Sequence, residues 1–414
     1  MTDVTKPTTR PAVVLAMLLL VYTFNFIDRQ ILGILAKPIK DDLGLTDTQL
    51  GALGGIAFAL LYSTLAIPLS WLADRTSRTW VVTVSLAIWS GFTALCGTAT
   101  GFWQLFLYRL GVGVGEAGGV APSYAIIADT YPAGQRARAL SVYNLGIPLG
   151  SAAGVLFGGY LAATVDWRWA FVAVGLAGLA IAPIFRLVVK EPVRAAASAD
   201  QTPIGRVFGI LAAKPSFWLL AFGAASSSML GYGLAFWLPS LMMRSFELTL
   251  VQAAQFYGAI LLIGGVAGVL LGGFVGDRLG ASDRAAYARL PAVSFWVAVP
   301  LFAVGILSKS VAVAFLCFLI PQALVYVWLA PVIAAVQHLV PAHMRATASA
   351  SFLLINNLIG LGLGSFAIGG LSDAMAAAYG AESLRYAMLT GFALYLLAGV
   401  LMWFAGKPLR KDLV

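Results

Sequence analysis

Long apolar stretches follow one another along almost the whole chain, and they constrain its fold more than any other feature. Of the 414 residues, 60% are hydrophobic and 10% are charged, whereas soluble domains carry about 25% charged residues. A stretch of about 20 apolar residues crosses the roughly 30 Å hydrocarbon core of a bilayer as a helix. We therefore predict an all-α integral membrane protein with no sizeable soluble domain.

Twelve of these stretches are predicted to span the membrane. Their approximate bounds are residues 11–35, 47–72, 79–98, 102–128, 137–163, 168–189, 214–242, 251–275, 287–307, 311–337, 345–370 and 384–406. The longest interior break separates six spans from six. It predicts an N-terminal six-helix bundle (1–189), a cytoplasmic linker (190–213) and a C-terminal six-helix bundle (214–414).

The linker contains one short apolar pattern of its own. Ile204, Val207, Phe208 and Leu211 recur at helical spacing beside Arg206. The pattern favours a short amphipathic helix on the inner membrane surface. A disordered linker is the alternative interpretation.

The net charge of +9 does not indicate a nucleic-acid partner, because the basic residues form no single face or stripe. They fall in short connectors, and most lie on one side when the N-terminus is placed inside. The positive-inside rule then predicts a multi-pass cell-membrane protein with both termini in the cytoplasm. The two cysteines, Cys96 and Cys317, each lie within an apolar stretch. They give no disulfide framework and no metal spacing, so no metal or cofactor is expected.

Four charged residues lie inside the predicted spans. Asp28 and Arg29 fall in the first, and Arg109 and Glu116 fall in the fourth. A charge at the bilayer centre costs about 3 kcal/mol on insertion scales, so such residues usually pair and mark an ion or substrate path. Arg109 and Glu116 are about 20° short of two full helical turns apart, so they share one face. Asp28 and Arg29 differ by about 100° and point different ways.

The second and eighth spans end in similar sequences. Asp74 and Arg75 follow the second, with Arg78 three residues on, and Asp277 and Arg278 follow the eighth. Each pair lies just inside the membrane, at the same point in each group of six spans. Two equivalent halves are typical of transporters that move around a central site.

These features resemble the major facilitator superfamily over essentially the whole chain. The two Asp-Arg loops match its G-x-x-x-D-R-x-G-R signature, although neither copy is complete. The first has Ser70 and Ser77 in place of glycine, and the second has Ala281 at the last basic position. The resemblance implies a transporter with two six-helix halves, not an enzyme.

Within the superfamily, the N-terminal half resembles the Spinster-like branch. The matching positions are Asn25, Asp28 and Arg29; Arg109, Glu116 and Ala117; residues 121–129; Gln135, Arg136 and Arg138; Ile147, Pro148, Gly150 and Ser151; Asp166, Trp167 and Trp169; and Glu191 and Pro192. Several also resemble symporters of hexuronates and other carboxylates. The resemblance implies that Asp28 and Glu116 titrate and that Arg29 and Arg109 are their partners or substrate anchors.

Two further sets of residues are predicted to act in transport. The first, predicted to latch the cytoplasmic side shut, comprises Asp74, Arg75, Arg78, Asp129, Asp277 and Arg278. The alternative for these charges is ordinary loop solubility. The second, predicted to line an aromatic substrate cavity in the nearly uncharged C-terminal half, comprises Asn356, Asn357, Tyr232, Phe236, Trp237 and Tyr326. The alternative for the aromatic residues is helix packing or interface anchoring.

Together these patterns predict a monomeric, proton-coupled secondary transporter of an amphiphilic, lipid-like anion. Its partners would be the substrate, protons and the lipid bilayer. A proton-coupled symporter of small organic anions such as sugar acids is the alternative. A static buried ion network that only fixes helix packing is the alternative for Asp28, Arg29, Arg109 and Glu116.

Overall fold

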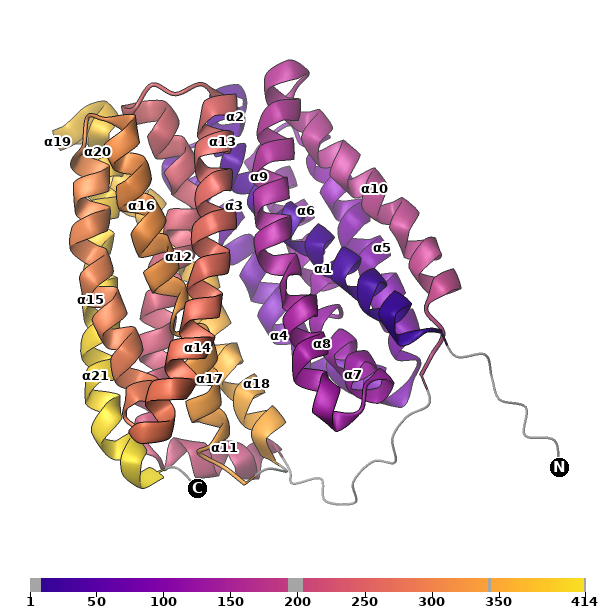
Figure 1. Ribbon diagram of the computed structural model, residues 1–414. Helices are drawn as coiled ribbons and strands as arrows, with labels where there is room; N and C mark the ends of the chain where they lie inside the picture. The colour runs from indigo at the N-terminus through magenta and orange to yellow at the C-terminus, as the bar shows by residue number, and fades with distance from the viewer. Residues whose placement is uncertain (1–8, 193–203, 342–343, 413–414) are drawn as a thin grey trace. The chain divides into compact units, whose positions relative to one another are not determined.

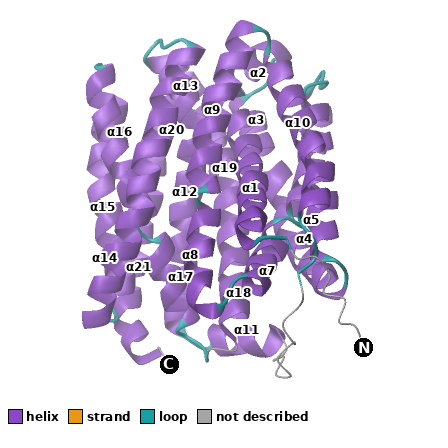
Figure 2. Cartoon of the chain, turned by 45° about the vertical axis from the view of Figure 1, so that its right-hand side comes forward, coloured by secondary structure: helices purple, strands orange, loops and turns teal. Residues whose placement is uncertain are grey.

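A computed structural model describes residues 9–192, 204–341 and 344–412 of the protein. Within these residues every regular element is a helix, and short loops join them (Figure 2). Eleven stretches of these described residues are long and apolar enough to cross a membrane. The all-α membrane fold is therefore confirmed.

The count of eleven differs from the predicted twelve because the last stretch is too long for one crossing. Thr347–Asp412 contains 66 residues, which as a single helix would be about 100 Å long. The helix breaks at Gly380, whose φ is +54°, a left-handed value that glycine adopts without strain. The two arms on either side of this break each have the length of one span.

The chain divides into two compact units. Unit 1 comprises residues 1–45 and 57–197, and unit 2 comprises residues 46–56 and 198–414. The helices of unit 1 run from indigo to magenta in Figure 1. They are α1 (Pro11–Ile34), α2 (Ala36–Leu43), α4 (Ile56–Arg75), α5 (Arg78–Cys96), α6 (Phe102–Glu116), α7 (Val120–Thr130), α8 (Ala133–Asn144), α9 (Gly146–Thr164) and α10 (Trp167–Val188).

Unit 2 contains α3 and the helices from residue 204 onward. They are α3 (Asp47–Gly54), α11 (Ile204–Ala212), α12 (Pro215–Ser245), α13 (Leu250–Ala259), the π-helix η1 (Ile260–Gly265), α14 (Val266–Ser282), α15 (Ala286–Leu307), α16 (Val311–Tyr326), α17 (Leu329–Gln337), α18 (Arg345–Asn356), the π-helix η3 (Asn357–Leu361), α19 (Gly362–Tyr379), the 3₁₀ helix η4 (Gly380–Glu382), α20 (Ser383–Gly391) and α21 (Ala393–Asp412).

The predicted second span is divided between the two units. Its first two turns, α3, pack with α19 in unit 2, whereas its continuation α4 belongs to unit 1. Gly55 separates the two helices with φ −111° and ψ −86°. A Cβ added there would lie 2.5 Å from the carbonyl oxygen of Gly362. The sequence boundary at 190–213 did not anticipate that residues 46–56 group with the second half of the chain.

The structure has a short helix at this part of the linker, α11 (Ile204–Ala212). Val207 and Leu211 are fully buried, whereas Phe208 is exposed. The helix therefore uses part of its apolar face for packing within unit 2. The remainder of the linker up to residue 203 lies outside the described residues, apart from residues 190–192 that follow α10.

Close packing of α1 against α9 positions the charged residues of α1. Glycines at residues 146, 150, 154 and 158 form one stripe along α9. A Cβ added to Gly150 would overlap the carbonyl oxygen of Thr23, and one added to Gly154 would lie 2.7 Å from the carbonyl oxygen of Ile27. The stripe thus lets the backbones of α1 and α9 approach closely, as small residues do in membrane helices.

Candidate functional site

The four intramembrane charges meet between α1 and α6 in unit 1. Asp28 Oδ2 lies 3.1 Å from Arg109 Nη1, and Arg29 Nη2 lies 2.8 Å from Glu116 Oε2. Two adjacent residues of α1 thus pair with two residues of α6 that lie on one face, two turns apart. We call these four residues the quartet. Its charges sum to zero when all are ionised, which reduces the cost of burying them.

The two acids of the quartet differ in their surroundings. Asp28 accepts a hydrogen bond from Thr93 at 2.6 Å on Oδ1 and from Arg109 on Oδ2, so both of its oxygens have donors. Glu116 is fully buried, and its Oε1 has no hydrogen-bond partner among the described residues. Oε1 is therefore the position at which a proton can add without displacing an existing hydrogen bond.

Aromatic rings surround the cation that pairs with Glu116. The guanidinium carbon of Arg29 lies 4.5 Å from the ring centroid of Tyr62, 4.8 Å from that of Phe58 and 5.1 Å from that of Phe26. Cation–π attraction of this kind is worth about 2 kcal/mol when the cation is desolvated. The rings hold Arg29 in place whether or not Glu116 carries its charge. Sequence reasoning missed these rings, because nothing in the spacing of Phe58 and Tyr62 indicates their partner.

A second group of charges in unit 1 joins the ends of three helices. Arg78 donates to Asp74 at 2.9 Å and forms an ion pair with Asp129. Arg75 instead stacks on Trp71, with its guanidinium carbon 4.0 Å from the ring centroid. Of the six residues predicted to latch the cytoplasmic side, the structure thus brings Asp74, Arg78 and Asp129 together.

The remaining latch residues belong to α14 in unit 2. Arg278 is exposed, and the side chain of Asp277 lies outside the described residues. The predicted role of this second Asp-Arg pair stays a prediction.

Glu191, which sequence reasoning did not assign to this group, caps the first turn of α5. It accepts hydrogen bonds from the backbone N–H groups of Arg78 and Thr79, at 2.9 and 3.0 Å, and from the hydroxyls of Ser77 and Thr79. Partial burial acts to raise the pKa of Glu191, but these hydrogen bonds outweigh it and hold the pKa below its ordinary value. We call Asp74, Arg78, Asp129 and Glu191 the Arg78 cluster.

Replacing Glu191 by Ala is expected to lower the stability of the protein by about 1–2 kcal/mol, the usual cost of a lost helix cap. Because folding lowers the pKa of Glu191, its stabilising effect is present above about pH 4.3 and is lost as the pH falls through the folded-state value. Thermal unfolding of both proteins between pH 7 and pH 3 would measure this. The difference should shrink toward pH 3, and a constant difference would contradict it. Asp41→Ala, at an exposed carboxylate, is the control and should change little.

A buried acidic group that sequence reasoning missed joins α3, α12 and α19 in unit 2. Asp47 is 2% exposed. Its carboxylate accepts one hydrogen bond from Nη1 and one from Nη2 of Arg244, each at 2.7 Å. Ser372 also donates to Asp47, at 2.7 Å. Asp373 accepts from the backbone N–H groups of Asp47 and Thr48, at 3.1 and 2.7 Å, and so caps α3 from α19. We call Asp47, Arg244, Ser372 and Asp373 the Asp47 cluster.

Two residues predicted to line the substrate cavity pack near this cluster. Trp237 is fully buried, and its indole N–H donates to the Ser365 carbonyl at 2.8 Å. The ring of Phe236 fills the space beside Gly54 of α3, where a Cβ would overlap it. Both rings take part in helix packing, and their contact with substrate stays a prediction.

The paired amides predicted for the cavity lie at an irregular point of unit 2. Asn356 is buried and accepts from the Ser228 hydroxyl at 2.8 Å, and its amide donates to Asn357 at 3.4 Å. The π-helix η3 begins at Asn357, and π-helical turns frequently mark functional sites. Tyr232 and Tyr326 are partly exposed on α12 and α16. These four residues stay candidates for substrate contact.

Helices long enough to span a membrane, with a neutral set of paired charges between two of them, are typical of a membrane transporter. Comparison with known proteins identifies its family. A model of the Major Facilitator Superfamily matches residues 18–365. The chain belongs to this superfamily, and its relatives place it among the Spinster-like transporters.

Three of these relatives are similar over most of their length. An MFS-type efflux pump of Mycolicibacterium smegmatis is 35% identical over 408 residues, which cover 96% of this chain and 93% of the relative. Protein spinster homolog 1 of Homo sapiens is 28% identical over 390 residues, 88% of this chain and 73% of the relative. A crystal structure of a bacterial homolog of the human lysosomal transporter Spinster, inward-facing and unoccupied, is 30% identical, with a TM-score of 0.89 and 99% of both chains covered.

Proposed function

We propose that the protein is a proton-coupled secondary transporter of an amphiphilic, lipid-like anion. The observation that carries this proposal is the quartet. Two acids and two arginines are paired within the spans, and one buried acid, Glu116, has an oxygen without a hydrogen-bond partner in the described part of the chain. Four buried charges that only fixed helix packing would add little stability, since buried ion pairs are often no better than apolar residues of the same volume.

The coupling follows from the pairing. A proton on Glu116 removes the charge that neutralises Arg29, which lies 2.8 Å away. The guanidinium, still held by the rings of Phe58 and Tyr62, can then bind an anionic head group. Loss of the proton restores the ion pair and displaces the anion. Asp28 and Arg109 provide a second pair of the same kind.

The predicted amphiphilic character rests on the contrast between the two units. The anion would bind Arg29 and Arg109 in unit 1. The nearly uncharged spans of unit 2 offer aromatic and amide side chains, of which Tyr232, Tyr326, Asn356 and Asn357 are the candidates for contact with an apolar chain. The name of the mycobacterial relative, an efflux pump, supports export as the direction of transport.

Alternating access would break and reform contacts in the Arg78 cluster and in the Asp47 cluster. The Arg78 cluster ties α4, α5 and α7 on the proposed cytoplasmic side. The Asp47 cluster ties α3 to α12 and α19. Breaking the contact between Asp47 and Arg244 would free α3 to move together with α4, the other part of the same span. We further propose a monomer in the cell membrane with both termini in the cytoplasm.

Proteoliposomes with an imposed pH gradient would test this function. The two probes are a fluorescent lysophosphatidate, measured as the fraction protected from albumin extraction, and radiolabelled glucuronate. We expect a gradient of two pH units to speed lysophosphatidate transport at least fivefold, and an uncoupler to remove that acceleration. Transport of glucuronate without transport of lysophosphatidate would favour the alternative function, a proton-coupled symporter of sugar acids. Equal rates with and without the gradient for both probes would show that transport is not proton-coupled.

A further inference from the structure

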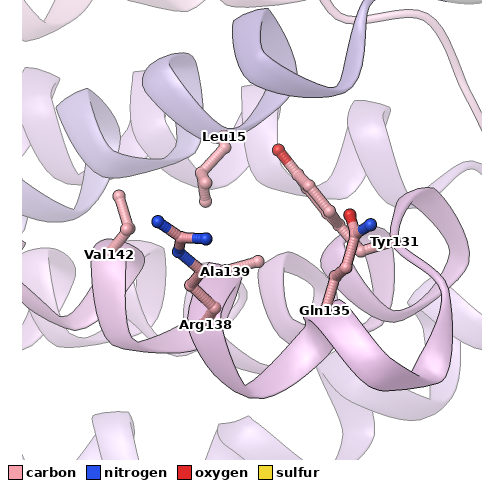
Figure 3. Close-up of a pocket in the computed structure, with 6 residues that line it drawn as sticks. All are labelled: Leu15, Tyr131, Gln135, Arg138, Ala139 and Val142. Carbon is pink, nitrogen blue, oxygen red and sulfur yellow. The ribbon is translucent and has the colours of Figure 1, made fainter.

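Unit 1 contains a cavity of about 350 Å³ between α1 and the beginning of α8. None of the residues that line it belongs to the quartet. They are Leu15 of α1, Tyr131 after α7, and Gln135, Arg138, Ala139 and Val142 of α8 (Figure 3). Its volume is within the range of about 300–1,000 Å³ that is usual for small-ligand sites.

The cavity is lined by both polar and apolar side chains. Figure 3 shows the guanidinium of Arg138 extending toward Leu15, with Tyr131 and Gln135 on one side and Val142 on the other. Arg138 has no ion pair or hydrogen bond within the part of the chain that the structure describes. Arg136, two residues earlier, donates instead to the backbone carbonyl of Tyr131 at 3.0 Å. The cavity thus offers one free guanidinium and two neutral hydrogen-bonding groups.

An exposed apolar stripe starts where the cavity ends. Val142 lines the cavity, and Leu145, Leu149, Leu156 and Tyr160 follow it along α8 and α9. All four are exposed. Their spacing of three, four, seven and four residues places them on one helical face. An alkyl chain that leaves the cavity at Val142 can therefore follow an apolar surface along the span.

We propose that this cavity is a loading site, where the phosphate or carboxylate head group of a single-chain amphiphile binds before it reaches the quartet. Arg138 would bind two oxygens of the head group through its planar guanidinium, and Tyr131 and Gln135 would donate further hydrogen bonds. The chain would lie along the stripe from Val142 to Tyr160. The inference rests on the proposed function, because it assigns a second binding position to the same class of substrate.

Counting bound copies of a single probe would test the proposal without any transport measurement. The full-length protein in neutral detergent is titrated with dodecyl phosphate, and native mass spectrometry resolves zero, one and two bound copies. Wild type should bind two copies, one in the cavity and one at the quartet. Arg138→Ala should weaken one of them at least tenfold and leave the other, and Leu15→Trp, which fills the cavity without changing its charge, should do the same. Arg136→Ala is the matched control, and both affinities should stay within twofold.

The outcomes separate this inference from the proposed function. Retention of both copies in Arg138→Ala and Leu15→Trp would overturn the loading site and leave the quartet untouched. Arg109→Ala should remove the other copy. If it removes none while Arg138→Ala removes one, the loading site stands and the quartet loses its role as anion anchor. If Arg136→Ala and Arg138→Ala weaken binding of dodecyl phosphate equally, the effect comes from surface charge, and the loading site is overturned. Competition by inorganic phosphate at the same concentration as dodecyl phosphate would show a site for free anions and overturn the amphiphile assignment.

Discussion

Replacement of Glu116 by Gln is expected to abolish the acceleration of lysophosphatidate transport by a pH gradient. Glutamine keeps the size of the side chain and an oxygen that accepts from Arg29, 2.8 Å away in the native pair, but it takes up no proton. The gradient-driven component of the rate should fall at least tenfold in proteoliposomes. Transport without a gradient should persist, because Arg29 remains held by its aromatic rings.

Asp28→Asn should remove coupling in the same way, but it also leaves Arg109 buried without an anion. Removing one partner of a buried pair costs about 3–5 kcal/mol, so this variant is paired with the double variant Asp28→Asn with Arg109→Gln, which removes both charges. Asp41→Asn is the control, since Asp41 is an exposed carboxylate that pairs with Lys37 of its own helix. Gradient-driven transport at the wild-type rate in both Glu116→Gln and Asp28→Asn would exclude these acids as the coupling groups.

Arg244→Ala is expected to destabilise the protein by about 3–5 kcal/mol, the usual effect of leaving a buried charge without its partner. The buried Asp47 would lose both guanidinium donors and keep the hydroxyl donor of Ser372. Arg244→Lys should cause a smaller loss, because the ammonium group keeps the positive charge beside Asp47. Some loss should remain, since it does not reproduce the two parallel hydrogen bonds of the guanidinium. Thermal unfolding of the purified variants in one detergent measures both effects.

Lys37→Ala is the control for the same change of charge. Lys37 pairs with Asp41 of its own helix, and the two side chains are 35% and 58% exposed. A pair of this kind contributes about 0.3–0.5 kcal/mol. Equal shifts in unfolding temperature for the Arg244 and Lys37 variants would show that the Asp47 cluster adds no more than an ordinary surface pair. Such a result would also remove the physical basis for treating it as a latch on α3.

Much of the membrane architecture could be predicted, because a bilayer allows few backbone conformations. Lipid offers no hydrogen bonds, so each long apolar stretch must satisfy its backbone internally as a helix. The bounds of α1, α5 and α10 accordingly lie within two residues of the predicted ones. The division of the second span was not predictable, since the break at Gly55 has no local signal beyond one glycine among several. The separation arises from the packing of α3 against α19.

The candidate site shows the same contrast. Asp28, Arg29, Arg109 and Glu116 were identifiable as functional because charge in an apolar stretch is costly wherever the chain places it. Asp47 carried no such signal, because an acid at the first turn of a helix is commonplace and compatible with solvent. Its burial depends on Arg244 and on the end of α19, which lie about 200 and 325 residues away along the chain.

The sequence by itself determined that this chain is a helical membrane protein, that it belongs with transporters, and that four charges lie within its spans. The membrane fold and the four charges follow from local composition, because each residue of a span must suit the bilayer. The transporter class follows from the resemblance of the Asp-Arg loops to the superfamily signature. Only the tertiary structure decided that Asp28 pairs with Arg109 and Arg29 with Glu116, that Glu116 keeps one oxygen without a donor, and that Arg138 reaches into a cavity while Arg136 does not. These facts depend on distances between helices, and such distances are set by packing among residues that are remote in sequence.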